Sequence, residues 1–319
     1  MRTLKNKGML PKLSVLFLVL VLAGSSAVLP ASSAVLSGSS AIANAGTQRR
    51  RAPKRIPQAS HASEAMSAEA RELVERAIDV TCKERRRDPQ GSVPIDEMQG
   101  RPSLPVRSPE AIAGAERAQR LLPLAKDLVI ESLSRLASEY KLTSRTSRIK
   151  LQQAMQRVRM VRRIKPDMDS RDNASVLMRN PVTITFGTIF LAGLPSDEAM
   201  VSVLGHELVH IADGDRDALL MLYRAIGNRA SALTGLDIRA QRAEELTCDV
   251  VGALAAREFV ADTPDYVPLP RRISRAVAHN CVAEDEGDED HLSPRNTIRS
   301  LLSLNPSLTR ELVYGRSNE

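Results

Sequence analysis

A chain of 319 residues, 43% of them hydrophobic, can bury a substantial core and suits one domain of ordinary size with an appended helical part. The net charge of +7 would suit a nucleic-acid partner, but only 3% of the residues are aromatic and none is Trp, which leaves few side chains on which bases could stack. We therefore expect no nucleic-acid partner.

The N-terminus, residues 1–45, is predicted to be an export signal or an N-terminal anchor. An apolar run from Leu13 to Ala23 follows several basic residues, and the chain then turns to Ala, Ser and Gly. Cleavage after Ala27, cleavage after Ala45 and an uncleaved anchor are all compatible with this pattern. We expect the protein to be exported: periplasmic, secreted, or anchored to the outer face of the cytoplasmic membrane, with this N-terminal segment as its link to the membrane.

Residues 46–62 are basic and contain prolines without apolar periodicity, which predicts a linker. The folded domain is expected over residues 63–319, and its first part, residues 63–150, is predicted to be a helical extension. The segment 46–110 lies between an export signal and a domain, where a removable prosegment would also lie. A packing role is the alternative for the first helix of that segment.

Apolar residues at helical spacing predict most of the remaining elements. The predicted helices run from Ser67 to Arg87, from Glu110 to Tyr140 with a bend at Pro123, from Ser144 to Ile164, from Ser196 to Ala212, from Arg239 to Phe259, and from Arg295 to Leu304. Between them, β-branched residues cluster over 174–191 and Asn180-Pro181 offers a turn, which predicts a hairpin. The expected class is a mainly helical α+β fold with a small β-sheet or hairpin before the fourth of these helices.

Three cysteines leave an odd count for an exported chain. Our preferred interpretation pairs Cys82 with Cys281 and leaves Cys248 unpaired. Three buried thiols are the alternative.

The stretch LGHELVHIAD, residues 204–213, carries two of the five histidines. Residues i and i+4 of a helix share one face, so His206 and His210 can direct two imidazoles at one ion, with Glu207 beside them. Zinc held by two imidazoles and one carboxylate keeps a fourth position for water, and an adjacent carboxylate can take the proton of that water. The stretch therefore predicts one catalytic Zn²⁺ per chain.

A third ligand is predicted within RAEELTCDVVGALAA, where Glu245 and Asp249 lie one helical turn apart. Glu245 can ligate the metal while Asp249 accepts the outer N–H of an imidazole and so orients the ring. Glu244 is the competing ligand, with Cys248 as its neighbour one turn later.

With these motifs the sequence resembles the zinc metallopeptidases that include the HtpX heat-shock protease and the CAAX prenyl protease, which are gluzincins. The resemblance covers roughly residues 158–304. It is carried by HELVH at 206–210, by ExxxD at 245–249 followed by Gly252, and by the β-rich stretch before the first motif.

The resemblance implies a zincin-like metallopeptidase domain that hydrolyses peptide bonds. It implies that His206, His210 and Glu245 are zinc ligands, that Glu207 is general base and general acid, and that Asp249 orients His206. Protein or peptide substrates would then be the partners, and part of residues 174–190 would form an edge strand for substrate pairing. The rival hypothesis is a chaperone-like binding protein on the same fold, with a shielded or non-catalytic zinc site.

His291, in DHLSPRNTIRSLL, is a further candidate for the catalytic site. It could donate to the oxyanion that develops during hydrolysis, or cover the metal and restrain activity, or be a solvated surface residue. Arg295 and Arg299 are alternative oxyanion partners. Tyr223 either reaches the cleft or belongs to the core.

Overall fold

The computed structural model describes residues 65–87, 102–170, 174–176, 183–194, 196–214, 217–263, 267, 271–272, 275 and 287–315. All of them belong to one of the two units into which the chain divides. The predicted export segment (1–45) and linker (46–62) lie outside the described residues, so both stay predictions. Within the described ranges, no helix combines the length and the apolar character needed to span a bilayer.

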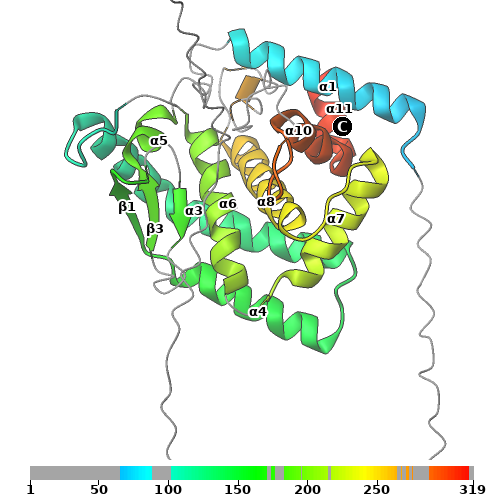
Figure 1. The fold of residues 1–319 in the computed structure, drawn as a ribbon, viewed down its shortest axis with the longest axis horizontal. Helices are drawn as coiled ribbons and strands as arrows, with labels where there is room; N and C mark the ends of the chain where they lie inside the picture. Colours follow the sequence, from blue (N-terminus) through cyan, green and yellow to red (C-terminus); the bar gives the residue numbers. More distant parts are fainter. Residues whose placement is uncertain are drawn as a thin grey trace, which may run out of the picture. The chain divides into compact units, whose positions relative to one another are not determined.

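Helices make up most of the described chain, which confirms the mainly helical α+β class (Figure 1). They are α1 (Ala68–Arg87), α3 (Pro109–Glu139), α4 (Arg145–Met160), α5 (Thr188–Gly193), α6 (Asp197–Asp213), α7 (Leu220–Thr234), α8 (Gln241–Asp262), α10 (Pro294–Leu304) and α11 (Pro306–Tyr314). The strands are β1 (Arg163–Asp167), β2 (Ala174–Val176) and β3 (Thr183–Gly187).

The core is built around α6 and α8, which lie side by side while α3 packs against both (Figure 1). Helix α6 begins where the sequence predicts it, because the Ser196 hydroxyl accepts the amide hydrogen of Ala199 and caps the first turn. It ends at Gly214, whose φ of 59° suits glycine. A buried ion pair fixes the first turn, with Arg272 Nε 2.6 Å from Glu198 Oε1.

Two glycines allow α6 and α8 to approach at backbone distance. A Cβ atom added to Gly205 would lie 2.8 Å from the Cα atom of Gly252, which is closer than real Cβ contacts. A Cβ atom added to Gly252 would collide with the carbonyl oxygen of Ser202 and lie 3.4 Å from the amide nitrogen of His206. Helices that touch backbone to backbone place their side chains on either side of the crossing in direct reach of each other.

The sheet has three strands in the order β1-β3-β2. β3 is buried throughout and pairs antiparallel with β2, as expected of the predicted hairpin, whose connection at 177–182 lies outside the described residues. β1 pairs parallel with β3 and was not predicted. β2 lies at the edge of the described sheet and contacts α6.

Two predicted boundaries were wrong at the sheet. The helix expected to reach Ile164 ends at Met160, because Pro166 disfavours helical backbone at the residue before it and the chain enters β1 instead. The β-rich stretch expected to run to 191 ends at Gly187, and the apolar residues that follow form the short helix α5, with Phe190 and Leu191 in the core.

The other helices show what local patterns can and cannot predict. α1 begins after Ser67, whose hydroxyl accepts the amide hydrogen of Ala70, and α3 continues through Pro123, where a bend was expected. α7 was not predicted, because its first residues carry no local cap; the Asp213 carboxylate at the end of α6 instead accepts the amide hydrogen of Leu219 at 2.6 Å. The terminal α11 was also not predicted.

A smaller hydrophobic cluster joins α1 to α10 and α11. Within it, Cys82 is disulfide-bonded, while Cys248 in α8 is a buried free thiol. The predicted partner, Cys281, lies outside the described residues. The first helix therefore packs against α10 and α11, and a removable prosegment over 46–110 stays a prediction.

Gly252→Ala tests the close crossing of α6 and α8. The added methyl group has no space without moving one helix, so we expect the free energy of unfolding to fall by about 1–3 kcal/mol, measured by urea denaturation. Ala261→Ser, which adds one heavy atom at a half-buried position on the last turn of α8, is the control and should change it by less than about 0.5 kcal/mol. A Gly252→Ala protein as stable as wild type would mean that the helices do not touch there.

Candidate metal centre

Helix α6 presents His206 and His210 on the face that packs against α8. Both imidazoles are largely buried, with 13% and 12% of the side chain exposed. Because the residues lie one helical turn apart, their rings meet edge to face with centroids 5.0 Å apart, and the two Nε2 atoms face each other at 3.2 Å. The inner nitrogens of the pair therefore point at one common location.

The carboxylate of Glu245, from the first turns of α8, reaches that location. Its Oε2 atom lies 3.3 Å from His206 Nε2 and 3.6 Å from His210 Nε2. Ligands of tetrahedral zinc at bond lengths of about 2.0–2.1 Å are separated by about 3.3–3.4 Å. The two nitrogens and the oxygen thus form a triangle of the size that one zinc ion requires.

The outer nitrogen of each imidazole also has a carboxylate partner. Asp249 Oδ1 lies 2.9 Å from His206 Nδ1, which is the pairing that the resemblance implies. Glu244 Oε1 lies 3.2 Å from His210 Nδ1. With both Nδ1 atoms hydrogen-bonded to carboxylates, the neutral tautomer keeps its proton on Nδ1 and leaves Nε2 free to ligate a metal.

Cys248 is the third residue of a buried group, with His206 and His210, that could hold a metal ion. Its Sγ atom contacts His210 at the outer nitrogen, 3.8 Å from Nδ1. That position lies on the opposite edge of the ring from the Nε2 triangle. One ion could therefore not use the Cys248 sulfur together with both Nε2 atoms unless the His210 ring turned over, so the distances favour Glu245 as third ligand.

The charges around the triangle favour a cation. Burial alone would lower the pKa of each imidazole, but hydrogen bonds and neighbouring negative charge raise the pKa of His206 and His210 well above the usual value. Burial tends to raise the pKa of Glu245, and hydrogen bonds and charge from the two imidazoles outweigh it and lower that pKa. The C-terminal end of α6, with its partial negative charge, adds to the same field.

Glu207 is 3% exposed and sits between the two histidines on α6. Burial raises the pKa of its carboxyl group. Within the described part of the chain, its carboxylate makes no hydrogen bond, unlike Glu244, Glu245 and Asp249. The carboxylate is therefore not engaged in holding the fold. Its charge interactions with both histidines and with Glu245 indicate that it lies beside the triangle, a position that suits proton transfer.

His291 reaches the triangle from the segment before α10. Its Nε2 atom lies 3.9 Å from Glu245 Oε2, and its Nδ1 atom is 3.1 Å from Asp288 Oδ1. Arg242 of α8 donates to the Asp288 carbonyl oxygen, and a bridge between Gly287 and Leu292 closes the turn. The structure therefore brings His291 to the site and does not place it as a solvated surface residue.

The remaining candidate residues, Arg295, Arg299 and Tyr223, lie outside the triangle. Arg295 and Arg299 are turned towards α1, where both bond to Glu75 at 3.1 and 2.8 Å, and they do not reach the triangle. Tyr223 is buried, and burial together with nearby acidic groups raises the pKa of its hydroxyl well above the usual value. Its hydroxyl thus belongs to the core behind the site, on the side of Cys248.

Three contributions were missed by sequence reasoning. The Gln241 amide donates to Glu245 Oε1 at 3.2 Å, Glu244 partners His210, and Asp288 holds His291. Gln241 lies four residues before Glu245, a spacing that could have indicated the contact. The roles of the other two depend on how separate segments meet, for which the local pattern holds no signal.

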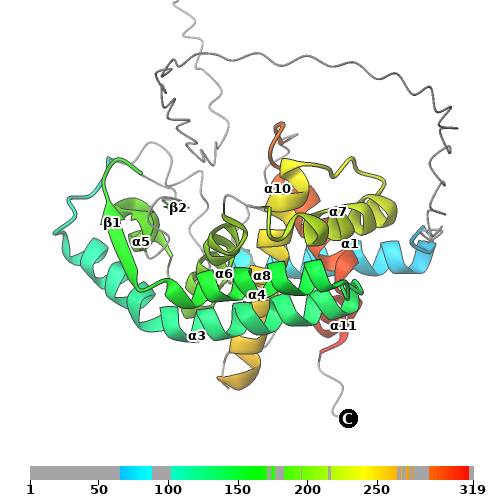
Figure 2. The same ribbon diagram turned by 90° about the horizontal axis from the view of Figure 1, so that it is seen from below.

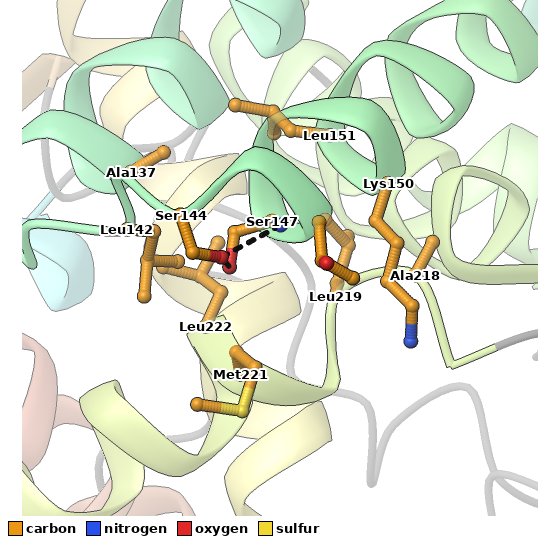
Figure 3. Close-up of a pocket in the computed structure, with 11 residues that line it drawn as sticks. Ala137, Leu142, Ser144, Ser147, Lys150, Leu151, Ala218, Leu219, Met221 and Leu222 are labelled. Atoms are coloured by element: carbon orange, nitrogen blue, oxygen red, sulfur yellow. Dashed lines mark hydrogen bonds between the residues drawn. The ribbon is translucent and has the colours of Figure 1, made fainter.

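A separate cavity of about 320 Å³ lies between the end of α3, the start of α4 and the start of α7 (Figure 3). Its lining is mostly apolar, with Lys150 and the hydroxyls of Ser144 and Ser147 at one side. It contains none of the residues of the triangle. The cavity is therefore not the metal centre, although Leu219 in its wall is hydrogen-bonded to Asp213 at the end of α6.

No protein-family profile, curated protein or solved structure matches the chain. A functional assignment therefore depends on the geometry of this site together with the motifs that carry the resemblance.

Asp249→Asn tests the orientation of His206. The Asn side chain has no negative charge and holds the N–H at His206 Nδ1 more weakly than the Asp carboxylate does. We therefore expect the affinity for zinc to fall by about 10- to 100-fold, measured by competition with a chromogenic chelator. Asp262→Asn, an exposed change on the last turn of α8, is the matched control and should leave the affinity unchanged. Equal affinities for both variants would show that Asp249 does not support the metal site.

Proposed function

We propose that this protein is an exported, zinc-dependent endopeptidase of the gluzincin class, on a zincin-like fold related to the HtpX and CAAX prenyl proteases. One observation carries the proposal: two imidazole nitrogens and one carboxylate oxygen, from two different helices, converge within 3.2 to 3.6 Å of each other. A buried carboxylate, Glu207, lies beside them. This set of residue types is the one that catalytic zinc uses.

His206, His210 and Glu245 would hold the metal, and Asp249 and Glu244 would orient the two imidazoles. Bound zinc supplies Lewis acidity, which lowers the pKa of a water molecule and polarises a peptide carbonyl group. Helix α6 holds both histidines rigidly at one spacing, and α8 supplies the third ligand and both orienting carboxylates. The chain itself therefore determines the geometry of the ligand set.

Glu207 would carry the proton. Its carboxylate accepts a proton from the attacking water and returns it to the nitrogen of the leaving amine, so that one group acts first as base and then as acid. Burial raises the pKa of Glu207, which brings its proton affinity closer to neutrality. The absence of any hydrogen bond to this carboxylate within the described residues leaves both oxygens available for that transfer.

An extended polypeptide would be the substrate. β2 lies at an edge of the described sheet and contacts α6, the helix that carries the histidines. An edge strand beside a metal centre can pair with a substrate through main-chain hydrogen bonds, which bind without strong sequence preference. Together with the predicted export of the chain, this mode of substrate binding suits a protease that degrades or matures envelope proteins, or a secreted protease.

A second function is favoured by the position of His291. With its Nε2 atom 3.9 Å from the Glu245 ligand oxygen, His291 stands where substrate carbonyl or water would approach. In that case the chain would bind misassembled proteins in the manner of a chaperone, with a shielded zinc site. The same position also suits a donor to the developing oxyanion, in which case removal of His291 slows hydrolysis.

Glu207→Gln tests the peptidase proposal. The amide keeps all three ligands but cannot carry a proton, so we expect about one zinc per chain in both proteins. The rate of casein hydrolysis should fall by about 10²- to 10⁴-fold or more. Metal content is measured by mass spectrometry, and hydrolysis is followed by release of labelled peptides.

Glu72→Gln, the same chemical change on the exposed side of α1, is the matched control and should retain wild-type activity. Hydrolysis by Glu207→Gln at the wild-type rate would contradict the role of Glu207. Zinc in the wild type without hydrolysis, followed by hydrolysis in His291→Ala, would establish the shielded site. Zinc without hydrolysis in either protein would favour the binding function.

A further inference from the structure

An unbroken run of positive charge covers α4 and the start of β1. Between residues 141 and 165 the chain carries nine Lys or Arg residues and no Asp or Glu: Lys141, Arg145, Arg148, Lys150, Arg157, Arg159, Arg162, Arg163 and Lys165. Outside the N-terminal residues 1–63, which are also basic, the rest of the sequence mixes both signs of charge. A helix of this composition has no internal ion pairs to offset its charge.

Only one arginine of α4 is used by the fold. Arg157 turns inward and donates to the carbonyl oxygens of Ala212 and Asp213, where it satisfies the last turn of α6. Ala154 and Val158 are buried on the same side. Arg145, Arg148 and Arg159 are exposed on the other side, and none has a carboxylate within ion-pair distance among the described residues.

Some exposed or half-exposed arginines elsewhere in the described structure do have such partners. Arg135 pairs with Glu258 at 2.9 Å, and Arg257 pairs with Glu311 at 2.7 Å. Arg71, Arg76 and Arg310 also have no ion-pair partner among the described residues, but α1 and α11 carry carboxylates as well. What sets α4 apart is that no acidic residue lies among its cations.

Two large apolar side chains lie beside these cations. Ile149 is 47% exposed and Met160 is 40% exposed. At about 100° per residue, Arg145, Arg148 and Arg159 lie on one half of the exposed surface of α4, and Ile149 and Met160 lie on the adjoining half. We call these five residues the basic face. α4 runs along the near side of the molecule in Figure 2, where no other helix covers it.

We propose that the basic face docks on the surface of a bilayer that contains anionic phospholipid. Unpaired guanidinium groups match the negative charge of the lipid headgroups, and the exposed Ile and Met side chains can enter the boundary between headgroups and acyl chains. Nucleic acid would use the cations but not the apolar half, and α4 has no aromatic side chain on which bases could stack. The face therefore fits a membrane better than a nucleic acid.

The cavity beside the N-terminal end of α4 lies on the other side of this helix and is not part of the basic face. Lys150 of α4 and Met221 of α7 both line it, and Met221 is 52% exposed (Figure 3). Docking of the basic face does not depend on the proposed peptidase activity, and it is distinct from the membrane link predicted for the N-terminal segment.

The test compares two variants of the full chain that lose the same charge. One carries Arg145→Gln, Arg148→Gln and Arg159→Gln in the basic face, and the control carries Arg71→Gln, Arg76→Gln and Arg310→Gln on α1 and α11. Co-sedimentation is measured with vesicles of phosphatidylcholine alone and with vesicles that also contain phosphatidylglycerol. All six arginines are exposed, and unfolding curves check that both variants keep the wild-type stability.

Each basic residue near an anionic surface strengthens partitioning by about fivefold, so the basic-face variant should bind phosphatidylglycerol vesicles on the order of 100-fold more weakly than the wild type. The control should bind them almost as the wild type does, and added salt should weaken wild-type binding. Binding to phosphatidylcholine, to which the N-terminal run can contribute, should be the same in all three proteins.

Equal losses in the two variants would overturn the proposal, because net charge alone would then explain binding. Equal wild-type affinity for both kinds of vesicle would overturn it as well. A basic-face variant that lost affinity for duplex DNA while keeping its affinity for phosphatidylglycerol vesicles would assign the face to nucleic acid instead.

Discussion

The backbone contact between Gly205 and Gly252 is the constraint on which the site depends. A side chain at either position would collide with the backbone of the other helix, so α6 and α8 would have to move apart. Glu245 Oε2 reaches both Nε2 atoms only because the helices cross at this distance, and Gly252 itself lies against the amide nitrogen of His206. The two glycines therefore set the position of the ligands without being part of the site.

Charge is the second constraint, because burying two imidazoles among four carboxylates is costly unless a cation balances them. Protons on the imidazoles supply part of that balance, which is why the pKa of both rings is raised. A divalent ion in the triangle would supply it with the ligand types and spacing that zinc prefers. The same electrostatic arrangement thus favours metal binding. It also suits the proposed role of Glu207 as proton carrier, since no hydrogen bond from a described residue restrains its carboxylate.

Much of this could be predicted from local pattern. The four-residue spacing of His206 and His210, the Ser196 cap and the Gly214 stop are properties of one helix, and the structure has all of them. Contacts between separate elements could not be predicted. Asp213 caps the start of α7 across a turn, and that capping left α7 without a local signal.

The metal ligands show the same difference between what the local pattern predicts and what depends on the packing of separate helices. Both the Glu244 and Glu245 alternatives were compatible with the motif, and only the rotation of α8 against α6 sends Glu244 to the outer nitrogen of His210 and Glu245 to the inner ones. That rotation is set by how the two helices pack, for which the local pattern holds no signal. It also places the sulfur of Cys248 on the outer side.

X-ray absorption at the zinc edge of the zinc-loaded protein tests the central claim most directly, because it distinguishes nitrogen and oxygen ligands from sulfur. The account predicts a nearest shell of nitrogen and oxygen atoms at about 2.0–2.1 Å, with no sulfur, from His206, His210 and Glu245. A sulfur neighbour at about 2.3 Å would contradict it. The metal would then lie with Cys248 on the outer side of His210, away from Glu207.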